Sequence, residues 1–254
     1  MTRSGTFRWE SELVKSLLPA VAKMSPGPRD LSVVTEVPCP SGGIPDIVGV
    51  LLDAAAIERR EASGLGAVTN PHEAVILSRL SEGEATLTEL ANVVFLSREH
   101  LRRSILPRLI SAGWIAPLQG RGESASTMLL VQYEDVAQWV VTVEAKLTDW
   151  RGGMSQALRH APSADAAYLA LDARFSRRVT LQASAASERG VGILTVDAST
   201  GAVEERSTPV RWQTQNVLRR ILAERVWTQL RSDHVPGHNA LVFGRDLGAL
   251  ALAG

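Results

Sequence analysis

The run Val140-Val141-Thr142-Val143-Glu144-Ala145-Lys146 decides the fold class, because it is typical of a strand inside a larger sheet. Strand alternation puts Glu144 and Lys146 on one face and their apolar neighbours on the other. Further along the chain, helical and β-type segments alternate: a helix at 153–161, a strand at 167–171, a helix at 175–188, a strand at 191–196 and a last helix at 212–230. Strands that alternate with helices predict an α/β sheet with crossover connections.

The residues before this run predict a helix and a hairpin. A helix is expected at 9–24, where apolar residues recur at helical spacing and Ser25-Pro26-Gly27-Pro28 ends the pattern. Glu10 lies at the start of the apolar stripe, so we expect it to face inward. Two β-type stretches follow at 31–37 and 44–52, and the turn between them is rich in proline, glycine and serine. Together they predict a hairpin.

The middle of the chain has the pattern of a separate unit. Charged and then Gly-rich residues at 57–70 are typical of a connection, which places a boundary there. Three helical segments and two β-type stretches around a polar loop follow, at 72–80, 87–95, 98–112, 114–118 and 127–132. The stretch Leu87-Thr-Glu-Leu-Ala91, with Leu96-Ser-Arg98 as a turn before an arginine-rich helix, resembles a winged helix-turn-helix. This resemblance implies an inserted winged-helix subdomain at 67–133.

Composition limits the classes of protein to consider. Of 254 residues, 45% are hydrophobic and 21% are charged, which argues against disordered, collagen-like and coiled-coil classes. Apolar runs fall short of the roughly 18 residues that a membrane helix needs, and the charged N-terminus does not resemble a secretory signal. We therefore expect a cytoplasmic protein without membrane contact. Basic and acidic residues balance at 27 each, so any contact with nucleic acid must come from local clusters.

Three carboxylates occupy positions that suit a hard metal ion. Asp46 follows a Ser-Gly-Gly turn at the start of a strand, Glu144 is two residues from Lys146, and Glu10 opens the first helix. Mg²⁺ and Mn²⁺ prefer carboxylate oxygens and water. A single cysteine and the lack of paired zinc-binding motifs argue against the usual zinc sites. The pattern therefore predicts a Mg²⁺ site, with Mn²⁺ as a substitute.

The order of these residues resembles the PD-(D/E)XK nuclease superfamily, the fold of many restriction endonucleases and archaeal Holliday-junction resolvases. The similarity lies in Gly43-Ile-Pro-Asp46 and in Val143-Glu-Ala-Lys146. The stretch Glu10-Ser-Glu-Leu-Val-Lys15 resembles the acidic first-helix motif of the resolvase-like branch. Gln156 and His160 are similar to the Q-x-x-x-Y element of helicase-associated nucleases, with histidine in place of tyrosine.

The resemblance covers residues 7–54 and 134–197 and implies an architecture. It implies a restriction-endonuclease-like core, in which helices flank a central mixed sheet. Residues 1–66 and 134–254 would form this discontinuous domain, with the winged helix inserted between its second and third strands.

The resemblance also implies metal-dependent hydrolysis of phosphodiester bonds and a role for each residue. Four residues would bind the metal ion: Asp46, Glu144, Ala145 through its backbone carbonyl, and Glu10. Lys146 would position the attacking water or help to deprotonate it, and Gln156 would orient the water or the phosphate.

Each of these signals also has an ordinary structural interpretation. The Glu144–Lys146 pair could face solvent from a half-exposed strand, and Asp46 could be a turn carboxylate. Glu10 could serve only as a favourable charge near a helix N-terminus. Gln156 and His160 could form a surface pair. Glu36, on the first strand, is an alternative metal ligand.

Basic residues of the middle unit are candidates for DNA contact. Arg98 and Arg102 share a helix face behind the N-cap candidate Ser97, where a recognition helix meets DNA. The predicted DNA-binding residues are Ser97, Arg98, Arg102, Arg103 and, in the loop of the wing, Arg121. They could equally form a solvated face, and winged helices also mediate protein contacts. The arginine-rich segment 206–231 could likewise be a solvated helix face or a patch that contacts the nucleic-acid backbone.

The sequence thus predicts a cytoplasmic, Mg²⁺-dependent endonuclease acting on duplex DNA, in restriction, phage defence or repair. A homodimer is expected by analogy with the family alone. Two alternatives stay open. The chain could be a non-catalytic DNA-binding regulator, or a partner-activated subunit, on a nuclease scaffold. It could also cleave RNA instead of DNA.

Overall fold

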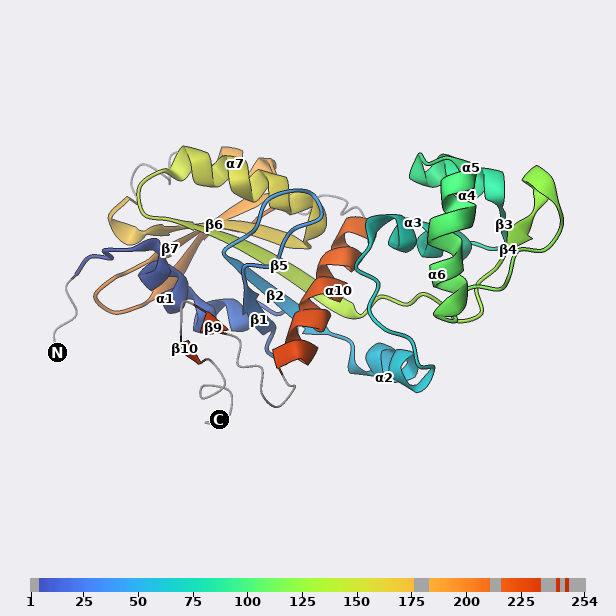
Figure 1. Ribbon diagram of the computed structural model, residues 1–254. Coiled ribbons are helices and arrows are strands. Elements are labelled where there is room, and N and C mark those ends of the chain that lie inside the picture. The colour runs from blue at the N-terminus through green and yellow to red at the C-terminus, as the bar shows by residue number, and fades with distance from the viewer. Residues whose placement is uncertain (1–4, 176–182, 211–215, 234–240, 243–244, 247–254) are drawn as a thin grey trace. The chain divides into compact units, whose positions relative to one another are not determined.

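The computed structural model describes residues 5–175, 183–210, 216–233, 241–242 and 245–246 (Figure 1). The chain divides into two compact units. The first unit combines Met1–Leu52 with Ala137–Gly254, and the second, Asp53–Val136, is inserted between two strands of the first. The insertion begins before the expected residue 67, because the helix α2 (Ala54–Ala62) belongs to it.

The first unit is built on one mixed sheet of six strands in the order β1-β2-β5-β6-β7-β8. The strands are β1 (Ser32–Thr35), β2 (Ile47–Leu52), β5 (Ala137–Lys146), β6 (Ala166–Asp172), β7 (Val191–Val196) and β8 (Val203–Ser207). The pairs β5–β6 and β6–β7 are parallel, and the other neighbouring pairs are antiparallel. Parallel neighbours need crossover connections, and these carry α7 (Trp150–His160) and α9 (Ala183–Glu188). The expected α/β class with a mixed central sheet is therefore confirmed.

Helices cover both faces of this sheet (Figure 1). On one face, α1 (Glu10–Ala22) buries Leu13 and Leu17 in a core that includes Val141 and Val143 of β5. On the other face, α7 and α9 bury small side chains against Leu169 and other apolar residues of β6 and β7. The helix α10 (Asn216–Asp233) packs against β2 and β5, beside the short helix η3 (Ala161–Ser163) that follows α7.

A tight turn precedes β2 and is tied to the end of α7. The backbone N–H of Cys39 donates to the carbonyl of Gly43 at 2.9 Å, and Gly43 has a φ of 82°, which glycine adopts readily. Ser41 Oγ donates to the carbonyl of Arg159 at 2.6 Å and accepts from Ser163 Oγ at 2.8 Å. These bonds couple the segment that carries Asp46 to the carboxyl end of α7.

Several sequence expectations differ from the structure of this unit. The strand expected at 31–37 is shorter, because Glu36 adopts a left-handed conformation (φ 59°) just after β1. The strand β8 was missed since it is an edge strand rich in exposed charged residues. Of the helix expected at 175–188, residues 183–188 form α9, Phe175 ends the short 3-10 helix η4 (Ala173–Phe175), and residues 176–182 lie outside the described residues.

The remaining elements of this unit lie late in the chain. Of the helix expected at 212–230, residues 212–215 lie outside the described residues, and α10 begins at Asn216. The short strands β9 (Leu241–Val242) and β10 (Arg245–Asp246) pair antiparallel with each other in a separate two-stranded sheet.

The inserted unit is mainly helical. Its elements after α2 are α3 (Pro71–Leu80), β3 (Ala85–Thr86), α4 (Leu87–Val94), α5 (Arg98–His100), η1 (Leu101–Ile105), α6 (Leu106–Ser111), η2 (Gly122–Ser124) and β4 (Ser126–Thr127). Thr86 and Glu89 form a reciprocal capping box that begins α4, where the sequence predicted a helix start. Strands β3 and β4 pair antiparallel. A single bridge between Ile115 and Leu129 joins the two β-type stretches that the sequence predicted, and a second bridge, between Gln119 and Ser126, joins the ends of the loop between them.

Two features of the inserted unit differ from the sequence expectations. Part of the connection expected at 57–70 is α2, which Asp53 caps by accepting from the N–H of Ala56 at 3.1 Å. The charged Arg60 of this helix is buried, with its guanidinium 5.2 Å from the ring centre of Trp114. The helix expected at 98–112 contains the π-helical segment η1, since Pro107 has no N–H to continue the regular pattern.

None of the helices in the described part of the chain has both the length and the apolar character needed to span a membrane.

Candidate functional site

Glu144 and Lys146 lie on one face of β5 near its end, as the alternation predicted. Both side chains are largely removed from solvent, with exposed fractions of 2% for Glu144 and 15% for Lys146. Lys146 Nζ lies 2.8 Å from Glu144 Oε1. The interpretation of this pair as solvent-facing is therefore wrong.

The pairing of β2 with β5 brings Asp46 to the same cluster. Asp46 directly precedes β2, whose first residue, Ile47, is opposite Val143 of β5 in this antiparallel pair. Asp46 therefore lies at the end of β5 that carries Glu144, and its negative charge acts on that glutamate. Asp46 Oδ2 accepts a hydrogen bond of 2.7 Å from the backbone N–H of Ala145, which fixes its carboxylate beside the end of β5.

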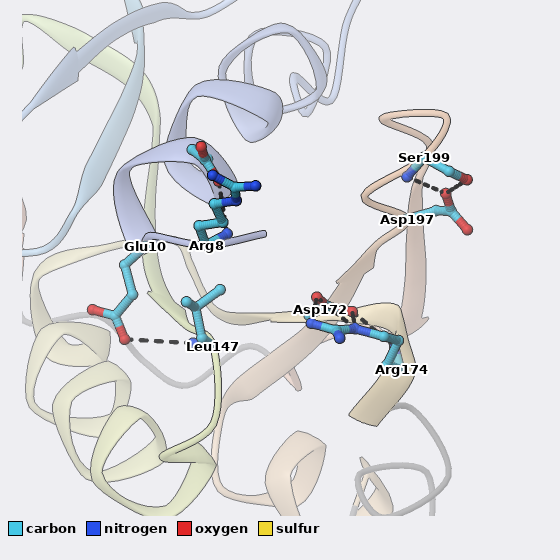
Figure 2. A network of polar contacts seen from close by, with 8 residues as sticks. Arg8, Glu10, Leu147, Asp172, Arg174, Asp197 and Ser199 are labelled. Atoms are coloured by element: carbon cyan, nitrogen blue, oxygen red, sulfur yellow. Dashed lines mark hydrogen bonds and ion pairs between the residues drawn. The ribbon is translucent and has the colours of Figure 1, made fainter. Parts of the chain in front are cut away.

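Glu10 approaches these residues from the start of α1. Figure 2 shows its carboxylate turned toward the backbone of Leu147, whose N–H donates to Glu10 Oε1 at 3.4 Å. Glu10 Oε2 lies 3.5 Å from Lys146 Nζ. The expectation that Glu10 faces inward is wrong, because 46% of its side chain is exposed. The helix start lies at the rim of the sheet, so this glutamate reaches around the rim instead of entering the core.

The electrostatics of the cluster favour a positively charged ligand. Burial raises the pKa of Asp46, and the hydrogen bond from Ala145 and the charge of Lys146 offset only part of the rise. Burial also raises the pKa of Glu144, and the negative charge of Asp46 adds to it. For Lys146, burial lowers the pKa, but the bond to Glu144 and the surrounding carboxylates outweigh it and raise the pKa overall. Lys146 is therefore protonated at neutral pH, where it faces three carboxylates.

The helix α7 contributes His160, for which the sequence left two interpretations open: part of a site element with Gln156, or one half of a surface pair. His160 has an exposed fraction of 2%, and its Nδ1 lies 3.8 Å from Glu144 Oε2. Burial, followed by the charges of Arg159 and Lys146, lowers the pKa of His160 to about 4. Gln156 lies one turn earlier on the helix and is half-buried. The surface interpretation is therefore wrong for His160. Its four-residue spacing from Gln156 gave no sign of its burial.

Two other acidic residues at strand ends, Glu36 and Asp172, differ in their exposure and in their partners. Glu36 is exposed, and its charge contributes weakly to the raised pKa of Asp46. Asp172, at the end of β6, is buried but already paired, since Arg174 NH2 lies 2.7 Å from its Oδ2 (Figure 2). The sequence interpretation did not single out Asp172. An aspartate that ends an otherwise apolar strand is a signal that could have found it.

The carboxylates of the cluster suit a divalent cation, but its side chains alone are too few to hold one. Two desolvated carboxylates that repel each other would be stabilised by a hard cation. Among the described residues, however, no group of three or more His, Cys, Asp and Glu side chains could hold a metal ion by itself. A cation bound here would therefore need oxygen ligands beyond the side chains, and Mg²⁺ commonly takes water and phosphate oxygens.

The predicted DNA-binding residues belong to the inserted unit and form no part of this cluster. Ser97 caps α5, since its Oγ accepts from the N–H of His100 at 3.2 Å. The four predicted arginines, Arg98, Arg102, Arg103 and Arg121, are all exposed. Arg103 also pairs with Glu99 at 2.5 Å, so the negative charge of Glu99 offsets the positive charge of Arg103.

No protein-family model matches this sequence, and no curated protein or solved structure shows significant similarity to it. A function for the chain must therefore follow from the geometry and chemistry of the site itself.

The raised pKa of Asp46 predicts that its charge destabilises the fold. An acid whose pKa is higher in the folded than in the unfolded state loses stability as the pH rises above its ordinary value of 3.8. Asp46→Asn keeps an oxygen that can accept from Ala145 but removes the charge. We expect the free energy of unfolding at pH 7 to increase by about 0.5–1 kcal/mol, measured by chemical denaturation.

The pH dependence provides the check on this prediction. The advantage of Asp46→Asn should vanish below pH 3.8, where the wild-type carboxyl is protonated in both states. Asp30→Asn is the matched control, because Asp30 forms an exposed ion pair with Lys23 and should change stability little. A loss of stability at pH 7 in Asp46→Asn would contradict the electrostatic account.

Proposed function

We propose that this chain is a metal-dependent nuclease of the PD-(D/E)XK class, with a restriction-endonuclease-like core. The observation that carries the proposal is that Asp46 and Glu144 lie together at the end of the β2–β5 pair, beside the protonated Lys146. Two desolvated carboxylates and an ammonium group impose an electrostatic cost on the fold, which is usual for a site built for chemistry. Phosphodiester hydrolysis uses both kinds of charge, since carboxylates hold a cation and an ammonium attracts the phosphate.

Each residue has a defined part in this proposal. Asp46, Glu144 and the backbone carbonyl of Ala145 would hold Mg²⁺ or Mn²⁺, with Glu10 at the rim. The metal ion would supply a positive centre that activates water and stabilises charge on the scissile phosphate. Lys146 acts as a charged hydrogen-bond donor to the phosphate and not as a base, because its pKa is raised. Gln156 would orient the water or the phosphate.

The inserted unit is proposed to bind duplex DNA as a winged helix-turn-helix. Ser97 caps the helix α5, which presents Arg98 to solvent, and η1, which continues it, presents Arg102. Arg121 lies in the loop between the β-type stretches, at the place of a wing. Exposed arginines on a helix and a loop can contact phosphates from two sides. A homodimer and a cytoplasmic location remain predictions from the sequence.

A second candidate is a DNA-binding protein in which the nuclease-like core is only a scaffold, or a subunit that needs a partner for activity. One observation favours it: no group of three ligating side chains in the described part of the chain could hold a metal ion. A protein of this kind would bind DNA through the inserted unit without cutting it. Cleavage assays separate the two candidates.

The proposed activity predicts metal-dependent cleavage. Purified protein should cut supercoiled and linear duplex DNA in the presence of Mg²⁺ or Mn²⁺, and it should lose this activity in EDTA. Matched RNA, assayed in parallel, tests the alternative substrate. Glu144→Gln and Lys146→Met should each lower the rate by at least about 100-fold, because each removes a charge from the site.

The control for cleavage is Glu12→Gln, an exposed glutamate on the first turn of α1 outside the cluster, which should leave the rate unchanged. Cleavage that survives both site variants would contradict the assignment. Duplex binding without any cleavage would favour the second candidate, and cleavage of RNA alone would replace the proposed substrate.

The proposed DNA contact predicts a change in salt dependence. The affinity of a protein for DNA falls as the salt concentration rises, because each arginine that neutralises a phosphate releases bound counterions. Each such arginine steepens the plot of log affinity against log salt concentration by about 1. The Arg98→Ala, Arg102→Ala double variant should therefore bind duplex DNA more weakly and reduce the slope by about 2. Arg108→Ala is the control, since Arg108 lies 2.9 Å from Glu73 within the same unit. An unchanged slope in the double variant would argue for a protein-binding module instead.

A further inference from the structure

The contact between His160 and Glu144 leaves two buried polar atoms without hydrogen bonds. Within the described residues, neither Nδ1 of His160 nor Oε2 of Glu144 has a hydrogen-bond partner, although neither atom is accessible to solvent. Buried polar atoms are nearly always paired, because each unpaired one carries the full cost of lost hydration. Here the two unpaired atoms face each other across 3.8 Å.

The gap between these atoms is small enough to close within the fold. A normal N–H···O hydrogen bond is about 2.9 Å long, so a shift of about 1 Å would form it. Glu144 Oε1 is held by Lys146 at 2.8 Å, so the carboxylate can turn about that bond toward the histidine.

The imidazole is enclosed on its other side by the turn before β2. A Cβ atom at Gly43 would lie only 2.8 Å from Nε2 of His160, so this glycine is needed for the ring to fit. The turn is itself held by the bonds of Ser41 to the carbonyl of Arg159 and to Ser163. His160 therefore has little freedom to turn away from Glu144.

We propose that His160 is a positioning residue for Glu144. Its imidazole carries a proton on Nδ1 and donates it in a hydrogen bond to Glu144 Oε2. Lys146 then fixes one oxygen of the carboxylate and His160 fixes the other, so that the carboxylate plane is set before any cation arrives. This inference rests on the proposed function, in which Glu144 binds the cation.

The chemistry of the imidazole supports this assignment of the proton. A neutral imidazole has one N–H group and one lone pair. If Nδ1 carried the lone pair, it would face the lone pairs of a buried carboxylate oxygen and repel them. Residues that orient a metal-binding carboxylate commonly affect metal affinity by 10- to 100-fold.

The test combines the tautomer of His160 with the metal affinity of matched variants. Long-range ¹H–¹⁵N spectra of the metal-free full chain report which ring nitrogen carries the proton, and the signals of His160 are those absent from the variants. His160→Asn places an amide N–H near the position of Nδ1, whereas His160→Gln extends to the position of Nε2. His160→Leu fills the same space without a donor. Calorimetry with Mn²⁺ measures binding in each variant, and thermal melting confirms that each is folded.

We expect the Nδ1–H tautomer in the wild type. We also expect Mn²⁺ affinity within about 3-fold of wild type in His160→Asn, but at least about 10-fold weaker in His160→Gln and His160→Leu. The Nε2–H tautomer, or equal losses in Asn and Gln variants that stay folded, would overturn the inference. If the wild type has the Nδ1–H tautomer but binds no Mn²⁺, the proposed metal-dependent function fails while the pairing of His160 with Glu144 stands.

Discussion

The register of β2 against β5 is the constraint on which the site depends. It brings Asp46, the residue before β2, to the end of β5 that carries Glu144, so that two largely desolvated carboxylates lie together. The hydrogen bond from the backbone of Ala145 to Asp46 holds this arrangement at the end of the strand pair. A shift in this register would move Asp46 away from the backbone of Ala145 and from Glu144, and the cluster would not exist.

The remaining elements support this pair of strands and limit what the carboxylates can do. Lys146 follows Glu144 on the same face and supplies a positive charge inside the cluster. The helix α7 closes the face with His160, and the turn at Gly43 backs the imidazole. Glu10 reaches the cluster from the rim. Unpaired polar atoms and raised carboxyl pKa values lower stability, a cost that proteins commonly accept at functional sites.

Much of the core could be predicted from the sequence because its signals are local. The alternation in β5 placed Glu144 and Lys146 on one face, and the succession of strands and helices gave the α/β class. Local patterns failed where packing with distant residues decides the outcome. The charges of α2 suggested a connection, but Arg60 is buried against Trp114. The burial of His160 likewise depends on the turn before β2, which lies more than a hundred residues earlier in the chain.

The central claim is that Asp46 and Glu144 together hold a divalent cation, and anomalous diffraction from crystals soaked in Mn²⁺ tests it most directly. The account predicts one anomalous peak within coordination distance of both carboxylates, absent from crystals of Asp46→Asn. A peak elsewhere on the molecule, or none beside the two carboxylates at saturating Mn²⁺, would contradict the claim.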